Sequence, residues 1–389
     1  METKVENKLR QDNGEKELIA RVAWEHWRAV RQSGSEMSEI IRRGLKGAKE
    51  SYIIDIRCSK PKAIEKMGMR SSITHLIPWG RDPRICRNLT LKSYHRLEDI
   101  GSAVRFHTVF VDVVRAHHWA YEASKILHCD ISIKSIKWYE ELDGQPIGVL
   151  CDWDSTEDYN TGYIGVVRPE IRKTASDKRS SKNSTNRLIG LSTGQSMNKD
   201  AVESPDPNSI APPDGERETS MIKPRHQTGT GPFMAVDLLC VGVPPLHKYR
   251  HDLESFFYVY VAVAAAYDPP EKHFRKVPWE QQSLVSIGIN KHMFLTNMDT
   301  RDEIFEYVHP EFEPLLNEDS FLMVLWEVFR KIARRGDDIR DAETSRARNV
   351  RLGIPANEFN MEKTEIEKER DSLMTYSTFM KILGEREDE

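Results

Sequence analysis

The chain has 389 residues, with 57 Lys and Arg against 61 Asp and Glu and a formal net charge of -4. This length can bury one large core or the two lobes of a single catalytic domain. Because the charges nearly balance, no basic field points to nucleic acid as a partner. The most apolar stretch, FFYVYVAVAAAY (256–267), is shorter than the roughly 20 residues of a membrane-spanning helix, so we expect no membrane partner.

The cysteines and the N-terminus indicate the compartment. Five cysteines are scattered without a CxxC pair (Cys58, Cys86, Cys129, Cys151 and Cys240), which argues against a disulfide framework and against a zinc ribbon. The first residues, METKVENKLRQDNGEKELI, lack the apolar core of a signal peptide. We therefore expect an intracellular protein, in the cytoplasm or the nucleus.

The first third of the chain predicts mixed structure. Residues 15–50 predict a strand followed by a helix, since SEMSEIIRRGLKGAKE has helical character. RICRNLTLKSY (84–94) is a candidate strand. In residues 102–125, apolar side chains recur at three- and four-residue spacing, which is typical of an amphipathic helix. This helix leads directly to His128.

The patterns that follow predict a hairpin, an insertion and a buried helix. Asp143-Gly144 separates two apolar runs, which indicates a hairpin whose second strand ends at Asp152. Residues 170–226 are rich in Ser, Thr, Asn, Pro and Gly, and their small apolar area predicts a disordered insertion. RHDLESFFYVYVAVAAAY (250–267) predicts a helix buried on all sides, and helical patterning continues towards the charged end.

Two aspartates carry the chemical argument. Asp130 follows His128 by two residues in KILHCDISIKSI (125–136), and Asp152 comes 22 residues after Asp130. In phosphoryl transfer one carboxylate orients the acceptor hydroxyl while another holds the Mg²⁺ that bridges the nucleotide phosphates. The hairpin between the aspartates would bring them to opposite sides of one cleft. Taken singly, His128 could brace the loop from the core and Asp130 could cap a turn.

Four stretches resemble protein kinases, and within them the fungal-type protein kinase family: DVVRAHHWAYEASKILHCDIS, GVLCDWD, TGTGPFMAVDLL and HDLESFFYV. The resemblance runs from about Arg21 to Ala265. It implies an α+β, two-lobed protein-kinase-like fold, with a small, reduced N-terminal lobe of few strands and a mainly helical C-terminal lobe. ATP and Mg²⁺ are the implied cofactors, and Ser or Thr of an unidentified protein is the implied acceptor.

The resemblance also implies an order of parts along the chain. A charged tail (1–15) precedes a partial N-terminal lobe (16–98). The C-terminal lobe begins with the catalytic loop and metal motif (99–169), is interrupted by the insertion in the activation segment (170–226), and continues to the end (227–389).

The motifs imply roles for single residues. HCD is similar to the kinase HRD motif, so Asp130 is the implied catalytic base, with His128 beside it. DWD is similar to DFG, which makes Asp152 the implied Mg²⁺ ligand. Ser135 takes the place of the asparagine that supplies a second Mg²⁺ ligand at the nucleotide.

Four further positions match the family by resemblance. Asp237 stands where the APE glutamate is expected, and Asp252 resembles the aspartate that holds the catalytic-loop backbone. Arg21 falls where the phosphate-pairing lysine is expected, with Glu36 or Glu39 as its partner. The simpler interpretation of both glutamates is a solvated helix face.

Some family features are absent from the sequence. Cys129 replaces the HRD arginine, and Ser135 is shorter than asparagine. Asp154 stands where other kinases have a hinge glycine, but the fungal-type family resembles this sequence there, so it counts little against activity. Only Gly14 is available before Arg21, too few glycines for a phosphate-binding loop. These departures leave two hypotheses, an active Ser/Thr kinase and a pseudokinase scaffold without turnover.

Two further alternatives concern the substrate and the insertion. A small-molecule kinase of the antibiotic-phosphotransferase kind shares the HxD loop and the metal aspartate, but it does not need a protein-substrate platform like GTGPFMAVD (229–237). The insertion could be a phosphorylation target that orders on modification. Its simpler interpretation is a tolerated surface insertion.

Overall fold

The computed structural model describes residues 6–9, 18–26, 34–45, 47–62, 84–155, 157–158, 229–239, 245–352 and 359–388. All structural statements concern these residues. In several outer strands, β1 and nearly all of β2 among them, the description extends to the backbone but not to the side chains. The insertion predicted at 170–226 lies outside the described residues, so its disorder stays a prediction.

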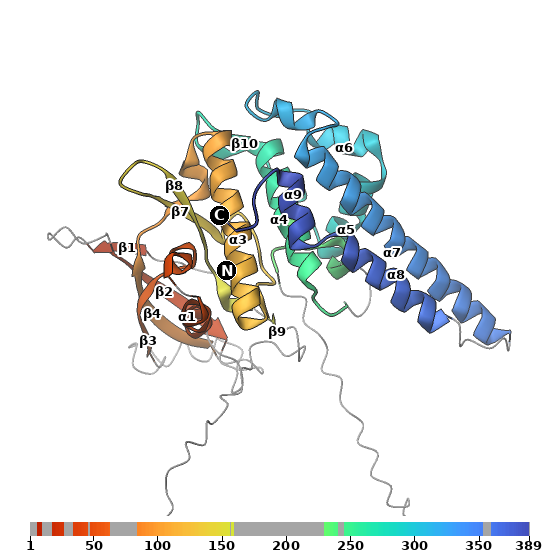
Figure 1. Ribbon diagram of the computed structural model, residues 1–389, viewed down its shortest axis with the longest axis horizontal. Helices are drawn as coiled ribbons and strands as arrows, with labels where there is room; N and C mark the ends of the chain where they lie inside the picture. The colour runs from red at the N-terminus through yellow and green to blue at the C-terminus, as the bar shows by residue number, and fades with distance from the viewer. Residues whose placement is uncertain are drawn as a thin grey trace, which may run out of the picture. The chain divides into compact units, whose positions relative to one another are not determined.

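Among the described residues of the N-terminal part, a four-stranded antiparallel sheet lies beside helix α1 (Figure 1). The strands follow the order β1-β2-β4-β3: β1 (Glu6–Leu9), β2 (Leu18–His26), β4 (Arg84–Lys92) and β3 (Ile56–Lys62). Helix α1 (Gly34–Gly44) follows β2 and packs against β3. The strand and helix predicted within 15–50 and the strand predicted at 84–94 are confirmed.

The long helix before the HCD motif is α3 (Ala103–Ser124). The Ser102 hydroxyl caps it by accepting the N–H of Arg105 at 3.2 Å, and Lys125 ends it with a φ of 55°. This confirms the helix predicted at 102–125.

A hairpin follows, made of β7 (Ile136–Glu140) and β8 (Pro146–Leu150). Gly144 supplies the φ of 83° that the turn needs. The second strand ends at Leu150, two residues earlier than the sequence predicts.

Short strand pairs complete the sheets. They are β5 (His95–Arg96) with β7, β6 (Ile126–Leu127) with β9 (Glu157–Asp158), and β10 (Tyr267–Asp268) with β11 (His273–Phe274). The β6–β9 pair matters for function because β6 ends directly before His128 and β9 begins five residues after Asp152. Their pairing holds the two motif segments side by side.

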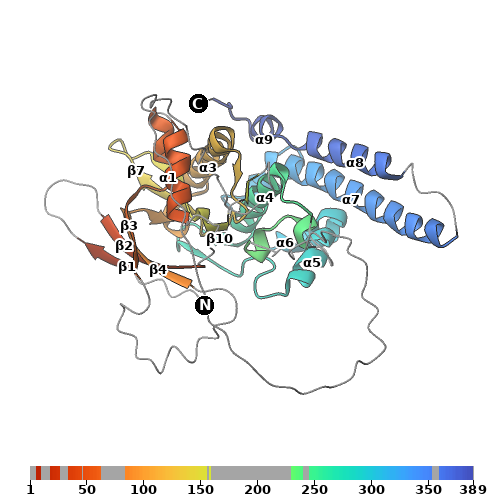
Figure 2. The same cartoon turned by 90° about the horizontal axis from the view of Figure 1, so that it is seen from below.

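Helix α4 (Tyr249–Ala266) is the core helix of the remaining part. Nearly every side chain on it is buried, as predicted, and Phe257 stacks on Phe329 of α7 with ring centroids 4.8 Å apart. The other helices are α5 (Leu284–Thr296), α6 (Met298–Ile304), α7 (Phe321–Arg351), α8 (Phe359–Leu373) and α9 (Tyr376–Leu383). Helices α7 and α8 lie side by side (Figures 1 and 2). Separate small sheets and many helices make this an α+β fold.

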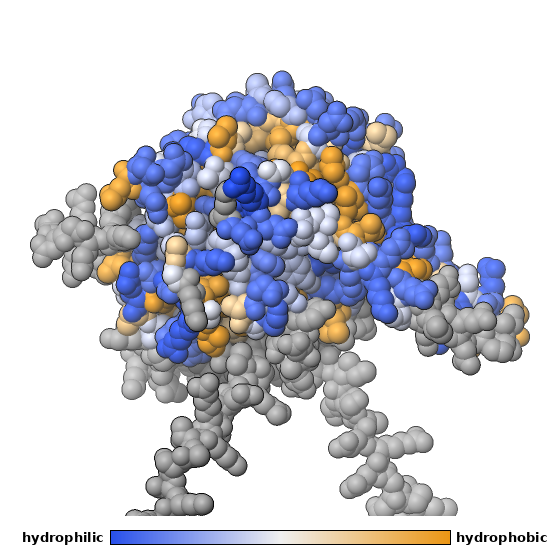
Figure 3. All heavy atoms as spheres, viewed as in Figure 1, coloured by the Kyte–Doolittle hydropathy of each residue, from blue (hydrophilic) through white to orange (hydrophobic). Residues whose placement is uncertain are grey.

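The surface is mainly polar, with apolar side chains in scattered patches on the face seen in Figure 3. None of the described helices is both long and apolar enough to cross a membrane. The apolar helix α4 is enclosed by other elements instead.

Strand β8 packs closely on α3 at Gly148. A Cβ at this position would overlap the carbonyl oxygen of Val109, so only glycine fits. The Gly148 N–H donates to Oδ2 of Asp112 at 2.8 Å, and Asp112 is 8% exposed. Burial raises the pKa of the Asp112 carboxyl to about 6, and the Gly148 hydrogen bond offsets only part of that effect.

Asp112→Asn should stabilise the chain at neutral pH. The folded-state pKa of about 6 lies above the ordinary 3.8. Protonated Asp112 therefore contributes its full stability to the folded state below about pH 4, and this stability is lost as the pH rises through about 6. At pH 7 the raised pKa corresponds to a loss of at most about 3 kcal/mol in the free energy of unfolding. Urea unfolding at about pH 7.5 and about pH 5 measures how much more stable Asp112→Asn is than wild type. The difference in the free energy of unfolding should be smaller at the lower pH. An equal advantage at both would contradict this account.

Candidate functional site

His128 joins the two motif segments through its ring. The ring is fully buried, and its Nε2 lies 2.8 Å from the Cys151 carbonyl oxygen. Because a carbonyl only accepts, Nε2 carries the hydrogen, and Nδ1 accepts the N–H of Asp130 at 3.3 Å. Burial lowers the pKa of His128 more than the nearby Asp252 carboxylate raises it, which favours this neutral ring. The Asp130 backbone is thus tied to the residue before Asp152.

Asp252 of α4 holds the loop from the other side. Its Oδ2 accepts the N–H of His128 at 2.9 Å, and its Oδ1 accepts the N–H of Cys129 at 3.2 Å. The rings of His117 and His247 each donate to it at 2.8 Å. Burial alone would raise the pKa of Asp252, but His247 and His117 hold it well below its usual range. The role expected for Asp252 in holding the catalytic-loop backbone is confirmed.

Asp130 meets the segment that follows the insertion. Its side chain is partly exposed, and its Oδ1 accepts the hydroxyl of Thr230 at 2.8 Å. Thr230 lies 100 residues further along the chain, so the fold brings the HCD and GTGPF motifs together. Thr230 belongs to the GTGPFMAVD stretch that carries the family resemblance, but the sequence analysis assigned it no role of its own.

Asp152 lies just beyond β8 in an unusual conformation. Its φ is 62°, and that of Cys129 is 63°. Positive φ is uncommon for residues other than glycine, disfavoured by roughly 1–3 kcal/mol, and concentrated at functional sites. Each of these residues directly follows one end of the His128–Cys151 hydrogen bond. The surrounding hydrogen bonds therefore stabilise both strained positions.

Asp154 packs against the start of α1. Its Oδ1 lies so close to Gly34 that a Cβ there would overlap it, and α1 contacts the short helical turn Trp153–Ser155. The indole of Trp153 is buried 4.6 Å from the His128 ring. The first residue of α1 is thereby positioned against the segment that carries Asp152.

The residues expected to bind phosphate are less completely described. Arg21 lies on β2 between Glu6 of β1 and Leu89 of β4, and its side chain is outside the described part. Glu36 and Glu39 are exposed on α1, where Glu39 forms an ion pair with Arg43. A pairing of Arg21 with either glutamate therefore stays a prediction.

Ser135 is buried within the loop that carries the HCD motif. Its hydroxyl donates to the carbonyl oxygen of Ser132 at 2.9 Å and accepts the Ser132 N–H at 2.9 Å. Its own carbonyl accepts the Cys151 N–H at 2.8 Å, which extends the contact between the two motif segments. The hydroxyl keeps one acceptor lone pair, so a metal-ligand role for Ser135 stays a prediction.

Residues 231–239 form a platform that is fixed from several sides. Glu254 of α4 accepts the Val236 N–H at 2.9 Å, and the buried Lys291 donates to the Met234 carbonyl. Burial lowers the pKa of Lys291 well below its ordinary value, and its ammonium lies 3.5 Å from the centre of the Tyr258 ring. These contacts anchor the platform to α4 and α5.

Asp237 links the platform to helices α4 and α8 through ion pairs. Both of its carboxylate oxygens accept from Arg370 of α8 at 2.8 Å, and Arg250 of α4 donates to it at 2.8 Å. Burial alone would raise the pKa of Asp237, but His251, Arg250 and Arg370 hold it well below its usual range. Arg370 lies 133 residues from Asp237, and no motif in the sequence points to it.

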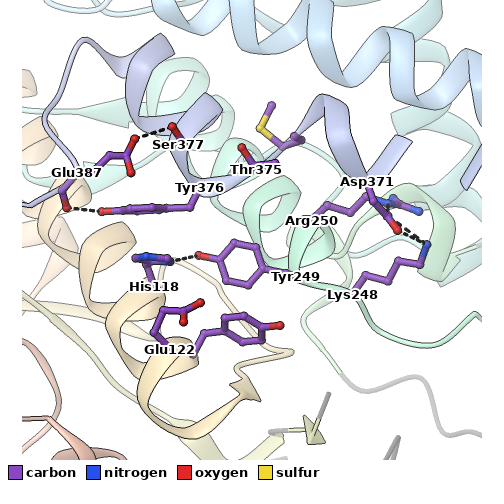
Figure 4. Close-up of a pocket in the computed structure, with 12 residues that line it drawn as sticks. His118, Glu122, Lys248, Tyr249, Arg250, Asp371, Thr375, Tyr376, Ser377 and Glu387 are labelled. Carbon is purple, nitrogen blue, oxygen red and sulfur yellow. Dashed lines mark hydrogen bonds and ion pairs between the residues drawn. The ribbon is translucent and has the colours of Figure 1, made fainter. Parts of the chain in front are cut away.

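A cavity of about 410 Å³ lies where α3, the start of α4 and the last two helices meet (Figure 4). Tyr249 and His118 form a hydrogen bond of 3.2 Å in its wall, and Lys248 and Arg250 pair with Asp371. Neither Asp130 nor Asp152 is among its lining residues, so it is separate from the motif aspartates.

The family assignment follows from a comparison with known families. A family described as fungal protein kinase matches residues 3–264, which is more than half of the chain. The chain belongs to the fungal protein kinase family. No curated protein matches it. The family match extends from the first described strand nearly to the end of α4 and includes both motif segments and the platform.

Arg370→Met should destabilise the chain by roughly 3 kcal/mol, because it removes the cation that donates to both oxygens of the buried Asp237 carboxylate. Arg335→Met is the matched control, since Arg335 forms solvent-exposed ion pairs with Asp338 and Glu369, and such pairs contribute little to stability. Urea unfolding of the three chains makes the comparison. Equal small losses in both variants would show that Arg370 is not an anchor.

Proposed function

We propose that the chain is an ATP- and Mg²⁺-dependent protein kinase that phosphorylates Ser or Thr of protein substrates. The observation that supports this best is the His128 ring, which links the backbone of Asp130 to the carbonyl directly before Asp152. One group alone would fit many proteins. A base and a metal carboxylate held at a fixed separation is what phosphoryl transfer requires.

The proposal includes the two-lobed arrangement of a kinase. The partial N-terminal lobe (16–98) would hold the four-stranded sheet and α1. The C-terminal lobe would comprise 99–169 and 227–389, with the insertion (170–226) in its activation segment. The nucleotide would bind between the lobes, with Arg21 at its phosphates and Glu36 or Glu39 orienting the arginine.

Asp130 would act as the base. The Asp130 carboxylate is partly exposed. Its Oδ1 accepts a hydrogen bond from the uncharged Thr230 hydroxyl, which fixes the position of that oxygen. The acceptor hydroxyl of the substrate would donate to Asp130 and so be oriented for attack. His128 is fully buried, so it would position Asp130 through the backbone without touching the substrate.

Asp152 would hold the metal. Its side chain is partly exposed, and carboxylate oxygens are the donors that Mg²⁺ prefers, so the residue present fits the ion. When bound, Mg²⁺ supplies charge neutralisation at the transferred phosphoryl group. Ser135 would be a weak second ligand through its remaining lone pair. Platform residues 231–239 would receive the protein substrate, which distinguishes this proposal from a small-molecule kinase.

Asp130→Asn should reduce kcat for phosphate transfer by about 10²–10⁴-fold while leaving nucleotide binding intact, because only the proton acceptor is lost. Asp143→Asn is the control, since Asp143 is an exposed turn residue whose Oδ1 accepts the Gln145 N–H at 3.0 Å, as an asparagine also can. Radiolabelled phosphate transfer to a mixed protein substrate measures the effect. Unchanged transfer by Asp130→Asn would refute its role as base.

Millimolar Mg-ATP should raise the melting temperature of the wild-type chain, and Asp152→Asn should lose the shift. Saturation at about 100 times Kd stabilises the folded state by about 2.7 kcal/mol. Thermal unfolding with and without nucleotide makes the comparison. A shift without transfer would indicate a nucleotide-binding pseudokinase, and the same shift in Asp152→Asn would exclude this residue as the metal ligand.

A further inference from the structure

Three side chains converge behind the catalytic loop in an arrangement that phosphate transfer does not require. The Sγ of Cys129, a ring nitrogen of His247 and a carboxylate oxygen of Asp252 all lie within 4.8 Å of one another. They come from the loop after β6, the residue before the α4 N-cap, and α4 itself. Cys129 is 3% exposed and Asp252 is fully buried, while 7% of the His247 side chain is exposed.

The donor atoms match the preference of zinc. Zn²⁺ binds thiolate, imidazole and carboxylate, and three protein ligands leave a fourth position for water. Mg²⁺ disfavours thiolate and prefers an all-oxygen shell, so such a site would be chemically distinct from the one at Asp152. We propose that Cys129, His247 and Asp252 form a zinc site beside the catalytic loop.

The geometry needs only small adjustments. Zinc bonds of about 2.0–2.3 Å in a tetrahedron separate the ligand atoms by about 3.5 Å. The cluster, at up to 4.8 Å, has to contract by roughly 1 Å, and the 2.8 Å His247–Asp252 hydrogen bond has to open by less than that. His247 lies outside α4, before its N-cap Lys248, so its side chain can rotate to open this hydrogen bond without disturbing the helix. On binding, the His247 ring would carry its hydrogen on Nδ1 so that Nε2 binds the metal, and the Cys129 thiol would release its proton to solvent.

The surroundings already orient the carboxylate. Asp252 accepts the N–H groups of His128 and Cys129 and the ring of His117. Hydrogen bonds of this kind orient metal ligands and strengthen binding. None of these three hydrogen bonds involves His247, so all three can persist when the ion binds.

The location gives the site a consequence. Cys129 lies between His128 and Asp130, so a bound ion would link the catalytic loop to the segment that begins α4. Zinc should therefore rigidify the loop whether or not the chain transfers phosphate. A metal-binding measurement is thus independent of the proposed kinase activity.

Cobalt titration of the purified full-length chain, stripped with a chelator, tests the site. Co²⁺ bound to a cysteine thiolate absorbs in the near ultraviolet, and we expect one equivalent to give this band and Zn²⁺ to abolish it. Excess Mg²⁺ should leave the band unchanged. Cys129→Ser should lose it, and His247→Gln should weaken Co²⁺ binding by about tenfold or more.

Cys151→Ser is the matched control, because Cys151 is also buried and lies on the far side of the His128 hydrogen bond. It should keep the band. No band in wild type, an unchanged band in Cys129→Ser, or loss of the band in Cys151→Ser would overturn the proposal. Near-ultraviolet circular dichroism checks that each variant is folded, and should Cys129→Ser fail to fold, Cys129→Ala and His247→Gln decide the question.

Discussion

The fully buried carboxylate of Asp252 is the constraint around which the catalytic loop is built. A buried charge without partners destabilises a fold by several kcal/mol. Here the loop supplies two backbone N–H groups, and His117 and His247 supply two rings. Helices α3 and α4 and the loop therefore have to assemble together for the charge to be stabilised. The direction of Asp130 follows from this assembly.

Patterns of short range in the sequence were sufficient for much of the fold. The apolar residues at three- and four-residue spacing predicted α3, and Asp143-Gly144 predicted the hairpin. Each of these patterns depends only on residues that are close together in the sequence. The end of β8 was misplaced since Cys151 continues the contact through a hydrogen bond to Ser135 outside the strand pairing. The place of Asp252 was predictable only by resemblance to a family.

The remaining partners depend on contacts between distant residues. Thr230 reaches Asp130, and Arg370 reaches Asp237, across 100 and 133 residues. Arg370 lies outside every quoted motif, and the GTGPFMAVD motif that contains Thr230 does not by itself identify Asp130 as its partner. Asp154 packs against Gly34, where a Cβ would overlap its carboxylate, and this contact between distant segments also has no local pattern in the sequence.

The ion pairs of Asp237 also bear on the order in which the chain can fold during synthesis. The carboxylate of Asp252 gains its partners as soon as α4 has been made. Asp237 gains Arg250 together with α4 but waits for Arg370, which leaves the ribosome more than a hundred residues later. Until α8 has been made, only contacts to α4 and α5 can hold the platform. The emergence of α8 completes the ion pairs that fix the platform.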